Sequence, residues 1–144
     1  MRHLRAEPGT YGLGLTLAAP THCTVGALGT WRFPAGHYIY VGSAWGPGGL
    51  RARVSRHLRG TGTTRWHIDY LRAYAQPAAL WLAPDAHLEC VWAQHLAAHP
   101  DAQIIAPRFG ASDCRCPSHL FYLENQTFND LDLPGHPTFA QTPP

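Results

Sequence analysis

Arginine is the most prominent source of chemistry in this sequence, which contains eleven arginines and no lysine. Five of them fall in one segment that contains no aspartate or glutamate: Arg51, Arg53, Arg56, Arg59 and Arg65. A guanidinium group presents a planar fork of donors that matches two phosphate oxygens. The segment therefore predicts a ligand rich in phosphate, although a solvated helix face would give the same composition.

A second set of side chains has the types of a zinc site. Cys114 and Cys116 are followed closely by His119, and Cys90 lies upstream. Zinc favours sulfur and imidazole ligands in a tetrahedral set, so these four residues are candidate ligands of a structural zinc ion. Alternatively, the surrounding loop lines a substrate groove with polar side chains: Ser112, Asp113, Arg115 and His119. The spacing of Cys114 and Cys116 is awkward for a mutual disulfide, and we expect reduced thiols.

Length and composition limit the class of protein. With 144 residues, 45% of them apolar, the chain can form one hydrophobic core but hardly two domains. We expect a polar leader over residues 1–8, one domain over 9–124, and a weakly ordered tail over 125–144 that is rich in Pro, Thr and Asn. No stretch approaches the ~18 apolar residues of a membrane helix, and no signal peptide is recognisable. A cytoplasmic protein without a membrane partner is expected.

The elements that must position these side chains begin with four extended segments. Residues 9–17 alternate, with Tyr11 on the same face as three leucines, and this pattern predicts a strand with one packed face. The segments 23–28 and 31–34 predict a loose hairpin. Residues 37–42 are aromatic and β-branched and predict a central strand, with Tyr38 and Tyr40 on one face.

Helical patterns follow a glycine-rich turn. Leu50, Val54 and Leu58 form the apolar stripe of a first helix, which places Arg53 and His57 along one edge of that stripe. We expect a second helix over 66–74, with Thr64 as its N-cap, and a third over 86–98, with Glu89 on its apolar side. Short strands are predicted over 78–82 and 119–124.

The order of these features resembles the GIY-YIG nuclease superfamily. Gly9-Thr10-Tyr11 resembles its first motif, and Tyr40-Val41-Gly42, about thirty residues later, resembles its second. The helix with Arg53 and the Arg56-His57 pair, and then Glu89 on a later helix, follow in the same order. The sequences WHIDYL, Glu89-Cys90 and FGASDCRCPSHL resemble a small stand-alone branch that is often called Uri-type. The resemblance covers roughly residues 9–124.

The resemblance implies a fold of the α/β (α+β) class. It implies a small central antiparallel sheet, mostly three-stranded and flanked by helices, with an extra N-terminal hairpin element and an irregular C-terminal segment. It also implies a divalent-metal-dependent endonuclease that hydrolyses phosphodiester bonds in DNA during repair or processing, with single-stranded and branched DNA as the alternative substrates. Without an appended DNA-reading module, low sequence specificity is expected.

The resemblance also implies roles for individual residues. Tyr11 is the candidate general base, Tyr40 would position the water or the base, and His57 would assist a proton relay. Arg53 would donate to the scissile phosphate, and Glu89 would bind one Mg²⁺ or Mn²⁺ ion. Substrate contacts are expected from Ser43, Arg51, Arg56, Arg59, Arg65 and His67.

Each of these residues also has a purely structural interpretation. Tyr11 and Tyr40 could be packed strand residues, the arginines could be solvated helix charges, and Glu89 could pair with an arginine. Two other functions therefore stay open. The first is a non-catalytic nucleic-acid-binding module, in which arginines contact phosphates and tyrosines stack on bases. The second is a small structural zinc-binding protein.

Overall fold

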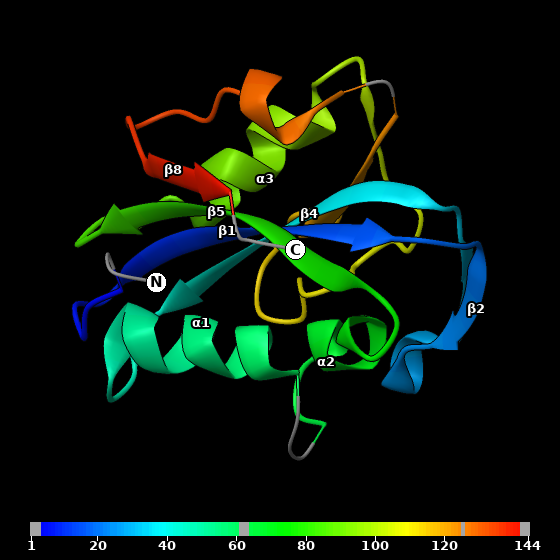
Figure 1. Ribbon diagram of the computed structural model, residues 1–144, viewed down its shortest axis with the longest axis horizontal. Coiled ribbons are helices and arrows are strands. Elements are labelled where there is room, and N and C mark those ends of the chain that lie inside the picture. Colours follow the sequence, from blue (N-terminus) through cyan, green and yellow to red (C-terminus); the bar gives the residue numbers. More distant parts are fainter. Residues whose placement is uncertain (1–3, 61–63, 125, 142–144) are drawn as a thin grey trace.

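The computed structural model describes residues 4–60, 64–124 and 126–141, and a mixed sheet-and-helix architecture surrounds one central strand (Figure 1). That strand is β1 (Gly9–Leu17), which pairs antiparallel with β4 (Gly36–Ala44) on one side and with β5 (Gln76–Pro84) on the other. A two-stranded hairpin of β2 (Thr21–Thr24) and β3 (Thr30–Phe33) connects β1 to β4, and the short 3₁₀ helix η1 (Gly26–Leu28) lies at its turn. The expected α+β class and the N-terminal hairpin are confirmed.

The sheet is wider than the mostly three-stranded sheet that the sequence predicts. Its order in the described part of the chain is β6-β7-β4-β1-β5-β8, six strands in all, and every pairing is antiparallel. The additional strands are β6 (Ala102–Gln103), β7 (Leu120–Leu123) and β8 (Thr138–Gln141). β7 was expected over residues 119–124. β6 and β8 are too short to produce an alternating pattern, so sequence periodicity does not reveal them.

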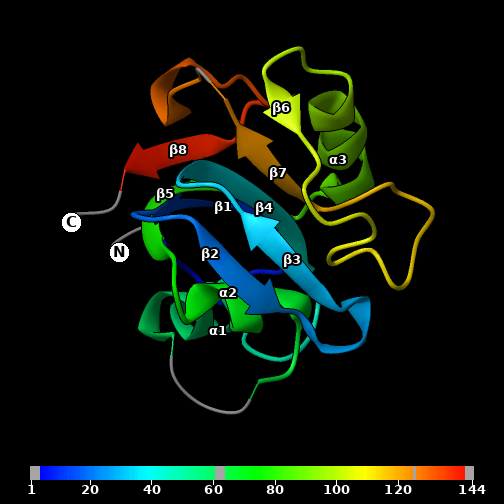
Figure 2. The same ribbon diagram turned by 90° about the vertical axis from the view of Figure 1, so that its right-hand side faces the viewer.

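In the described part of the chain, three α-helices cover the two faces of the sheet. α1 (Gly49–Arg59) and α2 (His67–Arg72) lie on one face, and α3 (Glu89–Ala97) lies on the other (Figures 1 and 2). α2 begins later than expected, because Trp66 rather than Thr64 is its N-cap residue and the Asp69 carboxylate accepts the Trp66 N–H at 2.8 Å. None of the helices in the described ranges has the length and apolarity required to cross a bilayer.

β1 is buried on both faces, so the prediction of one packed face is wrong. Tyr11, Leu13 and Leu15 pack toward α1 and α2. The opposite face carries Gly12 and Gly14, where an added Cβ would lie 3.2 Å from Trp81 and 3.0 Å from Phe128. The glycines thus make room for aromatic side chains of the second core, which contains α3.

The segment after residue 125 differs from the weakly ordered tail that the sequence predicts. Residues 126–141 contain η2 (Phe128–Asp130) and β8, which pairs with β5. Phe128, Leu131 and Leu133 are buried in the α3-side core. Asn129, Asp130 and Asp132 separate these apolar side chains, so the sequence shows no periodic pattern that would predict their burial. Residues 125 and 142–144 of the expected tail lie outside the described ranges.

The expected leader packs against the first helix. The backbone carbonyls of Glu7 and Arg5 accept the N–H groups of Leu50 and Arg51 at 2.8 and 2.9 Å. Leu4 is buried. Residues 4–8 therefore supply partners for the first turn of α1, where N–H groups have no partner within the helix. Residues 1–3 of the leader lie outside the described ranges.

Candidate functional site

β1, β4 and α1 bring two tyrosines and a histidine together. Pairing of β1 with β4 sets Tyr11 opposite Gly42 and Leu13 opposite Tyr40, so both phenols lie on the side of the sheet that α1 covers. The Tyr11 and Tyr40 ring centroids are 6.3 Å apart. Tyr11 Oη and His57 Nε2 form a buried hydrogen bond of 2.6 Å. Three residues that are distant in sequence therefore meet at one point.

Gly42 makes the position of the Tyr11 hydroxyl possible. A Cβ built on Gly42 would lie 2.5 Å from Tyr11 Oη, well inside any real contact distance. Only glycine leaves room for the phenol at this point of the strand pair. The glycine of the Tyr40-Val41-Gly42 motif is thus explained by the tyrosine of the first motif.

Burial sets the protonation of the Tyr11-His57 pair. Desolvation, assisted by Tyr40, raises the pKa of Tyr11 well above its usual value, while Arg53 acts in the opposite direction. Desolvation lowers the pKa of His57 to about 4. Both groups are therefore neutral at pH 7. The other ring nitrogen, His57 Nδ1, has no hydrogen-bond partner within the described part of the chain.

Ser43 forms hydrogen bonds with both Arg53 and Glu89, close to Tyr11 and His57. Its backbone carbonyl accepts a hydrogen bond from Arg53 Nη1 at 3.0 Å, and its hydroxyl donates to Glu89 Oε2 at 3.3 Å. Glu89 is the first residue of α3, and its side chain is 30% exposed. Burial raises the pKa of Glu89, whereas the Ser43 hydroxyl and the Arg53 charge lower it. Glu89 also acts on Tyr11 and raises the pKa of that phenol.

Three of the arginines stack on the ring of Trp66. The guanidinium carbons of Arg53, Arg56 and Arg65 lie 4.1, 4.4 and 5.1 Å from the ring centroid of Trp66. Cations over an aromatic face are attracted by its electrons. The four side chains line a surface pocket of about 320 Å³. Sequence reasoning assigned Trp66 no role, and its only signal was an aromatic residue directly after Arg65.

The expected substrate-binding residues have different surroundings. Arg56 forms an ion pair with Asp69 at 3.1 Å, and His67 Nδ1 accepts the Gly110 N–H at 2.8 Å. A second pocket of about 190 Å³ is lined by Tyr40, Arg65, Trp66, His67, Gly110, Ser112 and Asp113. These residues place the loop after Phe109 beside Tyr40.

Two of the predicted substrate-binding arginines point elsewhere. Arg51 Nε donates to the Leu4 carbonyl at 3.2 Å, so this side chain is turned toward the leader. Arg59 is exposed at the last residue of α1, and neither arginine lines the pocket over Trp66. The arginines of residues 51–65 therefore do not form one surface: three of them line the pocket over Trp66, and Arg51 and Arg59 lie elsewhere.

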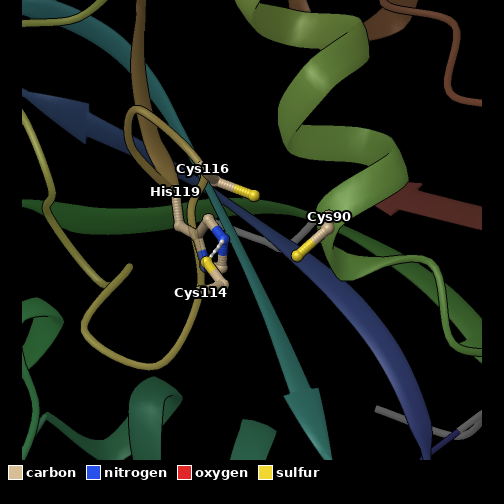
Figure 3. Close-up of side chains that lie close together, drawn as sticks. All are labelled: Cys90, Cys114, Cys116 and His119. Carbon is tan, nitrogen blue, oxygen red and sulfur yellow. Dashed lines mark hydrogen bonds between the residues drawn. The ribbon is translucent and has the colours of Figure 1, made fainter.

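Three cysteines and a histidine form a compact cluster (Figure 3), and the histidine lies close to Glu89. Cys90 comes from α3, Cys114 and Cys116 come from the loop before β7, and His119 directly precedes β7. Their ligand atoms all lie within 4.8 Å of one another, and no thiol is in a disulfide. The cluster could hold a metal ion, and a sulfur and imidazole donor set suits zinc rather than magnesium.

Arg108 and His119 connect this cluster to its surroundings. The Arg108 guanidinium donates to the carbonyls of Cys116 and Cys114, both at 2.6 Å, and so holds the loop in shape. His119 Nδ1 lies 3.8 Å from Glu89 Oε2. Burial lowers the pKa of His119 to about 4, with a further contribution from Arg108, so the ring is neutral and this contact is not an ion pair.

Comparison with known proteins identifies a family but no activity. The family model described as "Domain of unknown function DUF123" matches residues 10–133, which include every residue of both side-chain clusters. No curated protein and no solved structure matches the chain.

Proposed function

This chain belongs to the DUF123 family, a domain of unknown function, and we propose that it is a divalent-metal-dependent endonuclease that hydrolyses phosphodiester bonds in DNA. We further propose that its fold is of the GIY-YIG type and that its substrate is single-stranded, branched or damaged DNA. The observation that carries the proposal is the buried hydrogen bond between Tyr11 and His57 beside Tyr40, Arg53 and Glu89. These are the five residues that the sequence resemblance selects.

Arg53 is suited to the phosphate that is cut. Its Nη1 contacts the Ser43 carbonyl and its guanidinium lies on Trp66, so the side chain is held in one orientation before any substrate binds. Preorganised donors stabilise developing negative charge more effectively than donors that must reorient. The remaining N–H groups of Arg53 would donate to phosphate oxygens that gain charge during hydrolysis.

Tyr11 and His57 are suited to move the proton of the attacking water. In this proposal Tyr11 takes that proton while its own proton passes to His57 Nε2, so that the ring becomes a cation and the phenol stays neutral. A bound phosphodiester carries negative charge and favours the protonated histidine. Tyr40, which lies 6.1 Å from His57 between ring centroids, would hold the water in place.

Glu89 is the residue that would hold the divalent cation. A carboxylate with the Ser43 hydroxyl beside it offers hard oxygen ligands, and burial has already made its charged form unfavourable, which a cation would offset. When bound, Mg²⁺ or Mn²⁺ supplies Lewis-acid stabilisation of the phosphate. The partly exposed carboxylate leaves space for water and phosphate oxygens around such an ion.

Cleavage assays on a panel of DNA molecules test this function. Single-stranded, double-stranded, flapped and abasic oligonucleotides are incubated with wild-type protein, with and without Mg²⁺ or Mn²⁺. Cleavage of at least one substrate is expected only with the metal. Glu89→Ala and Tyr11→Phe are expected to lower its rate by about 10²-fold or more.

Matched variants outside the site control for contamination and for unfolding. Glu124→Ala and Tyr74→Phe change exposed residues of the same types and are expected to cleave like wild type. The proposal fails if wild-type protein cuts no oligonucleotide. It also fails if Tyr11→Phe and Glu89→Ala both retain full turnover.

The cysteine and histidine cluster favours a second candidate function, that of a small structural zinc-binding protein without catalysis. Stoichiometric zinc in a protein that cuts none of the substrates would support it. DNA binding that is independent of metal and without cleavage would instead support the non-catalytic nucleic-acid-binding module.

A further inference from the structure

The cysteine and histidine cluster has the dimensions of a tetrahedral zinc site. Zn–S bonds of about 2.3 Å and Zn–N bonds of about 2.0 Å put neighbouring ligand atoms roughly 3.4–3.8 Å apart in a tetrahedron. Cys114 Sγ and His119 Nε2 are already 3.4 Å apart, and all four ligand atoms lie within 4.8 Å. The four side chains converge on one point from α3 and from the loop before β7 (Figure 3). Small side-chain movements would complete the coordination.

The histidine of this cluster has an unused polar atom that faces the proposed active site. His119 is 1% exposed, and its Nδ1 has no hydrogen-bond partner among the residues that the structure describes. A buried polar atom without a partner is costly, so it calls for an explanation. The nearest acid group is Glu89, whose Oε2 lies 3.8 Å away.

We propose that Cys90, Cys114, Cys116 and His119 bind one zinc ion, and that His119 then orients Glu89. A metal on Nε2 leaves the ring proton on Nδ1, where it can donate to the Glu89 carboxylate after a small rotation of that side chain. Metal-binding histidines commonly donate their other N–H group to a carboxylate. The zinc site stands independently of the proposed nuclease function, whereas the importance of orienting Glu89 rests on it.

The zinc ion would also fix the element that carries Glu89. Cys90 follows Glu89 directly at the start of α3, so a bond from zinc to Cys90 restrains the backbone of its neighbour. The backbone carbonyls of Cys114 and Cys116 accept hydrogen bonds from the Arg108 guanidinium. The loop and α3 would thus be joined at the position where the proposed catalytic cation binds. Glu89 is a ligand of that cation, and His119 is a positioning residue.

Metal content is the first test. Purified wild-type protein is analysed for zinc, and the metal is then replaced with Co²⁺, whose visible spectrum reports tetrahedral thiolate coordination. About one zinc per chain and cobalt-thiolate bands are expected. After dialysis against a chelator, Cys114→Ser and Cys116→Ser should each contain at least tenfold less zinc per chain than wild type. Cys23→Ser, which changes a buried cysteine in β2, should retain it.

Wild-type protein decides the zinc site even if a cysteine variant fails to fold. Zinc below about one tenth per chain together with the absence of cobalt-thiolate bands overturns the site. Zinc-loaded wild-type protein that cuts no DNA would refute the nuclease function and leave the zinc site standing. The experiments can therefore refute the zinc site and the nuclease function independently of each other.

The orientation of Glu89 is tested with His119→Cys, which keeps a fourth zinc ligand but lacks the N–H group. We expect this variant to retain zinc and to bind Mn²⁺, measured by electron paramagnetic resonance, about tenfold more weakly. Mn²⁺ binding equal to that of wild type overturns the orienting role. Nitrogen-15 spectra of zinc-loaded wild-type protein provide a second readout, because they should show His119 protonated on Nδ1. Protonation on Nε2 would contradict the proposal.

Discussion

The chemical character of His57 comes from its surroundings. Its ring is 2% exposed and contacts Tyr11, Tyr40 and Trp66 through aromatic packing. Burial among these rings, assisted by the positive charges of nearby arginines, lowers the pKa of His57 and keeps the imidazole neutral at pH 7, whereas Asp69 acts in the opposite direction. A neutral ring can accept a proton from Tyr11, which a permanently charged side chain could not do.

The low pKa of His57 predicts a pH-dependent stability. The unfolded chain has a histidine of ordinary pKa, about 6.5, and the folded chain has one of about 4. Between these values the unfolded state binds more protons, so the free energy of unfolding falls as the pH falls from about 6.5 toward 4. The loss should approach ~3 kcal/mol. Urea unfolding of wild type and of His57→Gln at several pH values measures it.

Comparison with an exposed histidine isolates this effect. His22→Gln, in β2, should keep the wild-type dependence on pH, whereas His57→Gln should reduce it by the contribution of His57. The remaining dependence includes that of His119, whose pKa is also lowered to about 4. An unchanged pH dependence in His57→Gln would show that this ring is not the group responsible. The difference between variants is used because other groups titrate in the same range.

Motif order was sufficient to select the residues that meet at the site, but their partners could not be predicted. Tyr11, Tyr40, Arg53, His57 and Glu89 were chosen from sequence, and they do converge. The ion pair of Arg56 with Asp69 and the stacking of arginines on Trp66 depend on how α1 and α2 cross. Sequence spacing within one helix carries no information about that crossing.

At the scale of elements, the pairing of β1 with β4 determines the geometry of the site. The register sets Gly42 opposite Tyr11, and the hydroxyl occupies the space where a side chain of Gly42 would lie. A slip by one residue would turn one of the two tyrosines to the α3 side of the sheet and so separate the phenols. The pairing of β1 with β4 therefore determines the positions of both phenols independently of α1 and α3.

Gly42→Ala tests this dependence on the strand pair. The added methyl group must displace the Tyr11 hydroxyl, so we expect a loss of about 1–3 kcal/mol in the free energy of unfolding and a strong loss of cleavage. Gly46→Ala is the control, because a Cβ at Gly46 meets no atom within 4 Å. Denaturant unfolding and cleavage assays on both variants measure the difference. Wild-type values for Gly42→Ala would contradict the close packing.

The strands that sequence analysis missed lie toward the edges of the sheet. β1 was predicted from its alternating pattern and β4 from its aromatic and β-branched residues, and β5 was predicted as a shorter strand over 78–82. β6 has two residues and β8 has four, and their pairing with β7 and β5 depends on residues distant in sequence. Burial of Phe128 in the α3-side core holds the segment before β8 against the sheet. Tertiary contacts of this kind leave no local pattern.

At the scale of the whole molecule, a net charge of +2 conceals a local concentration of positive charge. Arg53, Arg56 and Arg65 surround Trp66 at one pocket, and the tyrosine site lies next to it. Charge gathered at one place attracts an anionic ligand more strongly than the same charge spread over a surface. The pocket is therefore the expected point of contact with a phosphate backbone.

The salt dependence of DNA binding tests this contact. Arg65 is exposed and lies over Trp66, so Arg65→Ala should remove about one phosphate contact and lower the slope of log affinity against log salt by about 1. Arg32→Ala, in β3, should leave the slope unchanged. Fluorescence anisotropy with labelled oligonucleotide gives both slopes, and we use a Glu89→Gln background because the proposed function requires Glu89 for cleavage. Equal slopes for Arg65→Ala and wild type would exclude Arg65 from the interface.

The hydrogen bonds from α1 to Arg5 and Glu7 have a practical consequence for shortened versions of this protein. A chain trimmed to start at the first motif, near Gly9, would leave the opening turn of the arginine-bearing helix without its carbonyl acceptors. Loss of that anchorage would loosen the helix that orients Arg53 and His57. Affinity tags and protease sites at the amino terminus should accordingly be placed before Leu4.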